Sequence, residues 1–286
     1  MRVLVLGASG FVGKHLTAAL RARGDEIEES SLRDPVAAAA AARSCDAVVN
    51  LAGESLAQRW NAAVKDRIES SRTQLPRRFL EALASNQRRP AVYVSASAIG
   101  YYGTSETTIF DEESPPGDDF LARVCRRWES EAFRARDLGM RVAVVRSGLV
   151  LDPEGGALAK TLPPFRMGLG GTIGNGRQWI SWIHRADAVA IYALALDRAA
   201  GAIDASAPNP VTNEEFTRTL ATVLKKPAVA PVPTLALRAL LGEGATMLLT
   251  GQRVLPKRVT EEYGYRFAFP ELESALRNLL DRHAEL

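Results

Sequence analysis

The sequence has few of the residues that build metal centres and disulfide frameworks. Its 286 residues include two cysteines, Cys45 and Cys125, which lie far apart in the chain, and three histidines that form no cluster. None of these residues has the spacing of a metal-binding motif. We therefore expect neither a disulfide-stabilised fold nor a bound metal.

Long apolar runs and a strong excess of one charge are also missing. The 36 basic and 33 acidic residues give a net charge of +3, and they are interspersed along the chain. This pattern is typical of solvated helix faces and indicates no nucleic-acid partner. No uninterrupted apolar run is long enough to cross a bilayer, so we expect no membrane partner. A first strand starting at Arg2 leaves no room for a signal peptide, and we expect a cytoplasmic protein unless an organelle targeting peptide has been removed.

What the sequence does have is a glycine-rich turn between an apolar strand at residues 1–6 and a helix at residues 14–23. The spacing is G-x-x-G-x-x-G. Glycines let a pyrophosphate approach the backbone closely, and the following helix N-terminus offers free N–H groups. The alternative is a tight turn that binds nothing; a mononucleotide P-loop is excluded because His15 replaces its Ser or Thr. The residues expected to hold the cofactor here are Gly7, Ser9, Gly10, Phe11, Val12 and Gly13.

Strands and helices alternate along the first two thirds of the chain. The expected strands are 1–6, 26–31, 46–51, 92–95, 141–146 and 201–205. The expected helices are 14–23, 34–44, 55–85 with a break near Pro76, 118–138, 185–198 and 213–225. The pattern predicts an α/β fold, a Rossmann-type doubly wound parallel sheet. Residues 1–150, completed by about 178–226, form the expected core, and residues 151–177 and 227–286 form a smaller C-terminal substrate lobe.

The end of the second strand indicates which dinucleotide binds. In this fold an acidic residue there favours NAD(H), and a basic one favours NADP(H). Ser31 and Arg33 therefore favour NADP(H). Glu28 and Glu29 keep NAD(H) open as the less favoured alternative.

Small residues at the ends of other strands complete the predicted cofactor site. They are Leu51, Ala52, Gly53 and Glu54 after the third strand, and Ser95 and Ala96 in the fourth. Arg72, in the helical stretch that follows the third strand, is a candidate for the adenine-ribose phosphate; its alternative role is a surface salt bridge.

Several segments together resemble a known family. They are GASGFVG, DAVVNLAGE, SASAIGYYG, RSGLVL, LPPFRMGLGG, GRQWISWIH and GQRVLPKR. The chain resembles the short-chain dehydrogenase/reductase superfamily in its extended, epimerase-like branch, and within that branch an atypical epimerase-family subgroup. The resemblance covers nearly the whole chain and implies bound NADP(H), with Ser147, Gly148 and Leu149 over the nicotinamide, and an unidentified small-molecule substrate. It leaves a homodimer open.

The resemblance also shows where catalytic residues are expected. Epimerase-like relatives carry a Tyr-x-x-x-Lys pair for proton transfer, but Phe120 and Val124 stand at those positions here. The remaining catalytic candidates are Ser97, where the superfamily's carbonyl-polarising serine lies, and Tyr101 or Tyr102 as proton exchanger. Aromatic packing is the alternative role for both tyrosines.

Two functions remain open at this point. The first is an NADP(H)-dependent oxidoreductase or epimerase-like enzyme of unknown substrate. The second is a non-catalytic NADP(H)-binding regulatory or scaffold protein, in line with cell-division labels carried by some relatives. The candidate substrate-binding residues of the lobe are Lys160, Arg166, Arg177, Trp179, Trp182 and His184, although we favour core packing for Trp182.

Overall fold

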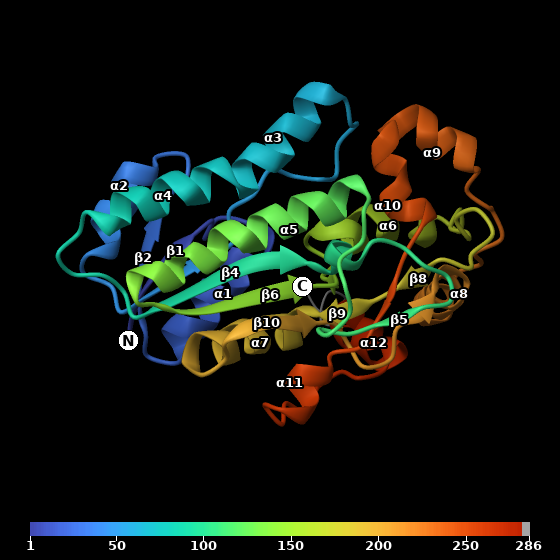
Figure 1. The fold of residues 1–286 in the computed structure, drawn as a ribbon. Coiled ribbons are helices and arrows are strands. Elements are labelled where there is room, and N and C mark those ends of the chain that lie inside the picture. Colours follow the sequence, from blue (N-terminus) through green and yellow to red (C-terminus); the bar gives the residue numbers. More distant parts are fainter. Residues whose placement is uncertain (282–286) are drawn as a thin grey trace.

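A computed structural model describes residues 1–281 and confirms the predicted α/β fold (Figure 1). Its centre is a six-stranded sheet in the order β10-β6-β4-β3-β1-β2, and every pairing in it is parallel. The strands are β1 (Arg2–Leu6), β2 (Glu26–Ser30), β3 (Ala47–Asn50), β4 (Val92–Ala98), β6 (Arg141–Ser147) and β10 (Gly201–Ala205). Continuous apolar runs suit such strands because helices cover both faces of a parallel sheet.

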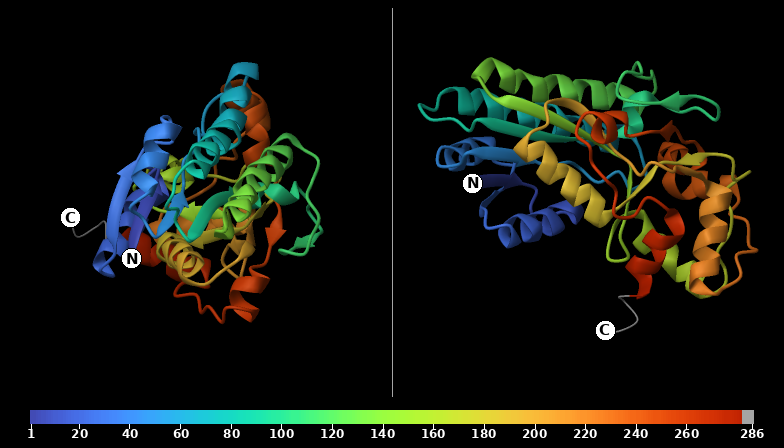
Figure 2. Two further views of the ribbon diagram at one scale, coloured as in Figure 1. Left: turned by 60° about the vertical axis from the view of Figure 1, so that its left-hand side comes forward. Right: turned by 90° about the horizontal axis from the view of Figure 1, so that it is seen from below.

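The helices form a layer on each side of the sheet (Figure 2). On one side are α2 (Pro35–Ala42), α4 (Gln74–Ala84) and α5 (Phe120–Phe133), which pack on Leu4, Val48 and Tyr93. On the other side are α1 (Phe11–Ala22) and α7 (Arg185–Asp197), which pack on Val5 and Val94. Alternate residues of each strand therefore belong to different cores.

The long helix expected at residues 55–85 is two helices, and the predicted break near Pro76 lies at Thr73, three residues earlier. Residues 55–61 are not helical, α3 covers Ala62–Arg72, and α4 begins at Gln74. The break is at Thr73, with φ −117° and ψ −59°. Pro76 lies within the first turn of α4, where its missing N–H costs nothing because that turn has no intrahelical acceptors.

The lobe contains more regular structure than its glycine- and proline-rich sequence suggested. Its helices are α6 (Gly156–Arg166), α8 (Asn213–Leu224), α9 (Thr234–Leu241), α10 (Thr246–Leu249) and α12 (Leu272–Asp281). Helix α11 (Lys257–Glu261), although within residues 227–286, packs on β10 through Val259, which belongs to the core of the sheet. Short strand pairs join it to the core: β7 (Leu149–Leu151) with β9 (Trp182–His184), β8 (Trp179–Ile180) with β11 (Val211–Thr212), and β5 (Ile109–Phe110) with β12 (Arg253–Val254). Three short 3-10 segments, η1 (Ile99–Tyr102), η2 (Arg134–Leu138) and η3 (Glu243–Ala245), complete the elements.

The lobe lies beyond the carboxyl ends of the sheet strands. The arrows of β4 and β6 point towards it in Figure 1. Its own apolar core surrounds Trp182, which is fully buried together with Phe165 of α6, Phe216 of α8 and Leu276 of α12. Of the segment 178–226, α7 and β10 therefore join the sheet, whereas α8 packs in the lobe. None of the helices within residues 1–281 is long and apolar enough to span a membrane.

Candidate functional site

The glycine turn forms a tight cradle at the end of β1. Gly7 has φ +89°, and the Gly10 N–H donates to the Gly7 carbonyl at 3.0 Å. A Cβ on Gly13 would lie 2.2 Å from the Gly7 carbonyl oxygen, and one on Gly7 would lie 3.0 Å from the Ala52 nitrogen. Gly10 caps α1 without a side-chain hydrogen bond, so the first N–H groups of the helix stay available. The backbone is therefore shaped to receive a phosphate group.

The tip of β2 presents a cation but no free carboxylate. Glu28 pairs with Arg2 at 3.0 Å, and Glu29 pairs with Arg21 at 2.7 Å. Arg33 is exposed, and its guanidinium has no ion pair within the described part of the chain. Its backbone N–H donates to the Ser31 hydroxyl at 3.2 Å, which brings these two predicted residues together. The glutamates that kept NAD(H) open are thus engaged elsewhere.

Arg72 lies at the strand end after β3. One Nη atom donates to the Glu54 carbonyl at 3.0 Å, and the other donates to the Ile68 carbonyl at 3.2 Å. The guanidinium carbon lies 5.1 Å from the centre of the Trp128 ring and rests against Gly53. Burial lowers the pKa of Arg72. Arg72 therefore lies between β3 and α5, and its contacts do not reach the tip of β2.

The turn after β6 is held against the lobe. The hydroxyl groups of Ser147 and Tyr192 are 3.2 Å apart, and the Leu149 N–H donates to the Ser181 carbonyl at 2.8 Å. A Cβ on Gly148 would come within 2.4 Å of that same carbonyl oxygen. Only glycine fits there, so the need for close packing explains Gly148 without any ligand.

The hydroxyl groups of the two serines of β4 both have partners within the protein. Ser95 is fully buried and donates to the Ala96 carbonyl at 3.0 Å. Ser97 is 4% exposed, and its hydroxyl donates to Oε1 of Glu129 at 2.7 Å. The structure thus gives the Ser97 hydroxyl a protein partner on α5.

A buried polar network that the sequence reasoning missed extends from Ser97. Arg146 of β6 forms a bidentate pair with Glu129, with Nε–Oε1 and Nη2–Oε2 both at 2.8 Å. Its Nη1 donates to the Tyr102 hydroxyl at 2.9 Å, and Tyr102 donates to the Asp204 carboxylate at 2.8 Å. The only sequence signal for this network was Arg146, a charged residue that directly follows the apolar residues 142–145 of the strand.

The titration of these groups follows from their burial. Burial raises the pKa of Tyr102, and the charge of Asp204 raises it further. Burial and the charge of Glu112 raise the pKa of Asp204 well above its usual range. Burial alone would lower the pKa of Arg146, but hydrogen bonding and the charge of Glu129 outweigh it and raise that pKa. Tyr102 is therefore a poor proton donor at neutral pH, since burial and the charge of Asp204 both disfavour its deprotonated form.

Tyr101 differs from its neighbour in having an uncommitted hydroxyl. Its side chain is half-buried, and its ring lies over the Arg146 guanidinium, with 3.5 Å between the guanidinium carbon and the ring centre. The Tyr102 ring meets it edge-on at 5.4 Å. Within residues 1–281 no group forms a hydrogen bond with the Tyr101 hydroxyl. Of the three catalytic candidates, Tyr101 alone keeps a free polar group.

Phe120 and Val124 lie on the face of α5 that α3 covers. Phe120 meets the Trp60 ring edge-on at 5.5 Å. Val124 is 2% exposed and belongs to one apolar cluster with Trp60, Val64 and Ile68. The apolar residues on α5 therefore match an apolar partner helix.

The candidate substrate-binding residues of the lobe have different partners. Lys160 of α6 donates to the Ala57 carbonyl at 3.3 Å, whereas the Trp179 indole donates to the Glu106 carbonyl at 2.8 Å. Arg166 is exposed at the end of α6 and has no ion pair within the described residues. Their role in substrate binding therefore stays a prediction.

His184 lies in the interior of the lobe. It is 2% exposed, its Nδ1 accepts the Ala186 N–H at 3.0 Å, and its ring stacks on Phe269 at 3.9 Å. Burial lowers the pKa of His184 to about 4. The structure thus places His184 as the N-cap of α7 rather than on a surface open to substrate.

Three side chains within the described residues come close enough to share a cation. His15, Asp152 and Glu154 offer donor atoms within 4.8 Å of one another. However, Asp152 already has partners in the protein. The Nε2 atom of His15 lies 2.7 Å from its Oδ2 atom, and both of its oxygens accept hydrogen bonds from Nη1 of Arg185 at 3.1 Å. The arrangement is a complete ion-pair group, and we assign no metal to it.

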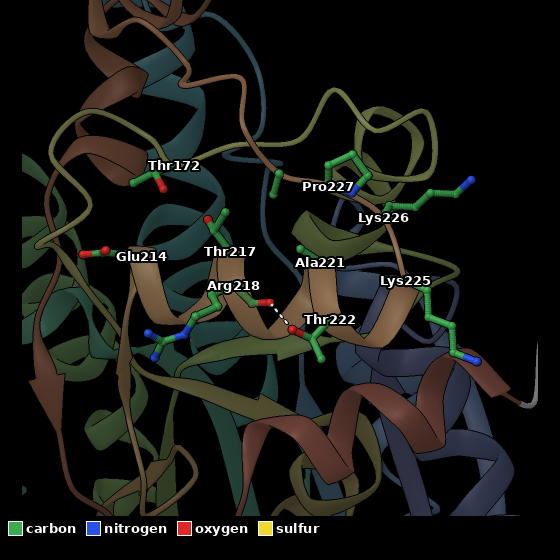
Figure 3. Close-up of a pocket in the computed structure, with 10 residues that line it drawn as sticks. Thr172, Glu214, Thr217, Arg218, Ala221, Thr222, Lys225, Lys226 and Pro227 are labelled. Carbon is green, nitrogen blue, oxygen red and sulfur yellow. Dashed lines mark hydrogen bonds between the residues drawn. The ribbon is translucent and has the colours of Figure 1, made fainter.

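A separate hollow of about 540 Å³ opens beside α8 (Figure 3). Arg218, Lys225 and Lys226 line it together with the hydroxyl groups of Thr172 and Thr217. It contains none of the residues predicted for cofactor, substrate or catalysis. The candidate site is therefore the edge of the sheet formed by the glycine cradle, the β2 tip and η1, and not this hollow.

The fold and the glycine cradle define a class: an α/β protein built to bind a dinucleotide at the carboxyl edge of its sheet. Comparison with protein families narrows this class. Residues 3–205 match the NAD dependent epimerase/dehydratase family, and residues 232–279 match a domain of unknown function, DUF1731. The chain belongs to this epimerase family, in the group of the SDR39U1 proteins.

Individual relatives support that membership. The chain is 42% identical to the chloroplastic SDR39U1 homologue of Arabidopsis thaliana over 98% of its own length and 87% of that protein. It is 40% identical to human SDR39U1 over 98% of its length and the whole of that protein. The crystal structure of human SDR39U1 with NADPH superposes with a TM-score of 0.90 at 37% identity, covering 98% of this chain and 99% of the other.

Proposed function

We propose that this protein binds NADP(H) at the carboxyl edge of its sheet and acts as an oxidoreductase on a small carbonyl compound or secondary alcohol. One observation carries the cofactor assignment: the tip of β2 presents the exposed Arg33, while Glu28 and Glu29 are paired with other arginines. A guanidinium is suited to a 2′-phosphate, which only NADP(H) has. The NADPH in the human relative's crystal structure supports the same assignment.

The glycine cradle fits the cofactor's pyrophosphate. The 2.2 Å between a Cβ on Gly13 and the Gly7 oxygen shows that the turn is too tight for any side chain, and Gly10 leaves the first N–H groups of α1 uncapped. These groups and the helix dipole favour an anion. The cofactor, when bound, supplies hydride chemistry, and the protein supplies orientation and proton transfer.

The proton step is assigned to Tyr101. Reduction of a carbonyl needs a proton at the substrate oxygen, and oxidation of an alcohol needs that proton removed. The hydroxyl groups of Ser97 and Tyr102 are bound to Glu129 and Asp204, whereas the Tyr101 hydroxyl is uncommitted. In this proposal Ser97 holds Glu129 in place and does not polarise the substrate.

A non-catalytic NADP(H)-binding regulatory or scaffold protein is the second candidate. It is favoured by Phe120 and Val124, which stand where epimerase-like relatives are expected to carry Tyr and Lys; Val124 is 2% exposed, and Phe120 is half-buried against Trp60. This candidate shares the cofactor site of the first and differs only in the absence of turnover.

Cofactor titrations and a carbonyl panel test both candidates. Replacing Arg33 with Ala should weaken NADPH binding by about 10- to 100-fold, because a charged hydrogen bond contributes about 1.5–3 kcal/mol, and should leave NADH binding unchanged. Arg88→Ala is the matched control, an exposed arginine paired with Asp46 at the opposite end of the sheet. Equal loss of NADH and NADPH affinity would contradict the 2′-phosphate assignment. NADPH binding without oxidation by any aldehyde, ketone or sugar nucleotide would favour the second candidate.

A further inference from the structure

We propose that Arg146 is a positioning residue that holds the Tyr101 ring for proton exchange at the substrate oxygen. This inference rests on the proposed hydride transfer and names the residue on which its proton step depends. Arg146 does not itself touch substrate or cofactor in this proposal; it acts through the face of its guanidinium group.

The guanidinium plane of Arg146 is fixed by its own partners. Arg146 is 4% exposed and stands opposite Ser97 in the register of β4 and β6. Glu129 holds two of its nitrogens at 2.8 Å each, and the third donates to the Tyr102 hydroxyl at 2.9 Å. A planar guanidinium group whose three nitrogens all form hydrogen bonds has little rotational freedom left.

That fixed plane supports the Tyr101 ring. The guanidinium carbon lies 3.5 Å from the ring centre, within stacking contact, and the Tyr102 ring closes a second side at 5.4 Å. The Tyr101 carbonyl also accepts the Gly117 N–H at 2.9 Å, which anchors the backbone of η1. Ring and backbone are therefore both held, while the hydroxyl is left without a protein partner.

This combination is what a proton-exchanging group requires. A general acid or base contributes only if its acidic atom is presented to the substrate in a defined direction. Lysine would keep the positive charge at position 146, but it has neither the bidentate fork nor a flat face for stacking. The Arg146→Lys variant therefore removes the support of the Tyr101 ring and retains the positive charge.

Fluorine NMR on protein containing 3-fluorotyrosine can follow Tyr101 directly. The resonance among the six tyrosines is assigned by its loss in Tyr101→Phe. We expect NADPH to shift this resonance in the wild type, because the proposal places the Tyr101 hydroxyl at the substrate oxygen, beside the nicotinamide. The shift should be lost in Arg146→Lys, because the Tyr101 ring loses its support. The NADPH affinity of this variant should stay within about twofold of wild type, because Arg146 is not a cofactor ligand in the proposal.

Arg141→Lys is the matched control. Arg141 begins the same strand, β6, and donates to backbone carbonyls of α7, including that of Leu196 at 2.6 Å. It should retain the NADPH-induced shift. If Arg146→Lys also retains the shift, or if NADPH fails to shift the wild-type resonance, the inference is overturned. If Arg146→Lys does not fold, Glu129→Gln loosens the same fork and should reduce the same response, and an unchanged response there would equally overturn it.

Turnover separates this inference from the proposed function. With a carbonyl that the wild type reduces, Tyr101→Phe should lower kcat by about 100-fold or more, and Arg146→Lys should lower kcat with KM unchanged. A purely structural Arg146 would change KM, NADPH affinity and kcat together. A normal fluorine response with no carbonyl reduced would refute the proposed oxidoreductase and leave the support of Tyr101 by Arg146 intact.

Discussion

Acidification should destabilise this protein through His184, and the size of the effect can be worked out. His184 is neutral in the folded state because burial lowers its pKa to about 4, whereas an unfolded histidine titrates near pH 6.5. The folded pKa is the lower of the two, so the unfolded chain takes up a proton first as the pH falls. The stability contribution is fully present above about pH 6.5 and is lost between about pH 6.5 and pH 4.

The magnitude follows from the difference of about 2.5 pKa units. Each unit is worth about 1.4 kcal/mol, so the free energy of unfolding should fall by about 2 kcal/mol at pH 5 and by about 3 kcal/mol at pH 4 from this residue alone. This is a large part of the stability of a typical domain.

The test compares the wild type with His184→Asn in urea unfolding at a series of pH values. Asparagine can still accept the Ala186 N–H as an N-cap but does not titrate. Losing the stack on Phe269 lowers the stability of the variant by a constant amount, so only the pH dependence of the difference is informative. The difference between the two proteins should shrink by about 3 kcal/mol from pH 7 to pH 4. A difference that stays constant would refute the assignment of a neutral, buried His184.

Two further substitutions test the cofactor cradle and the sealed face of α5. Gly13→Ala should abolish NADPH binding in a fluorescence titration, because the added Cβ would lie 2.2 Å from the Gly7 carbonyl oxygen. Ala18→Gly, in the same helix, is the control: it should lower the free energy of unfolding by about 1 kcal/mol and retain NADPH binding. Val124→Lys should lower the free energy of unfolding by about 2–5 kcal/mol, because the ammonium group would replace a side chain that is 2% exposed. Val36→Lys, at a position 71% exposed, is the control and should change this free energy by less than about 0.5 kcal/mol. Equal effects of the two substitutions would show that α3 does not cover position 124.

The core of the fold was predictable because its signals are local. The apolar strand at residues 2–6 and the glycine turn after it follow from side-chain chemistry within a few residues. The parallel sheet as a whole was also predictable, since a chain of alternating strands and helices has few possible topologies. A break near Pro76 was predictable, because a proline is a visible helix breaker in a sequence. Its exact place at Thr73 was not, because the packing of α3 over α5 cannot be read from the sequence.

The candidate site was predictable where its residues directly follow the ends of β1 and β2. Gly7, Gly10 and Gly13 form the expected cradle, and Arg33 and Ser31 meet at the expected strand tip. These positions follow directly from the order of β1, α1 and β2.

The side-chain part of the site depends on contacts across the sheet, which spacing does not reveal. Glu129 and Arg146 are on α5 and β6, and only the register of β4 against β6 places Ser97 between them. His184 illustrates the converse: a residue type suited to chemistry is an N-cap here, because the chain folds it under Phe269.

The contact between the lobe and the first turn of α1 has a thermodynamic consequence. A Cβ on Gly155 would lie 2.4 Å from the Phe11 ring, so the segment after β7 rests directly on the helix that begins at the cradle. Asp152, in the same segment, is paired with His15 one turn further along. Any motion that lifts the lobe must therefore slide this segment off α1. A dinucleotide bound at the first turn of α1 would shift the lobe only as far as its affinity differs between lobe positions, because a ligand moves such an equilibrium by that difference alone.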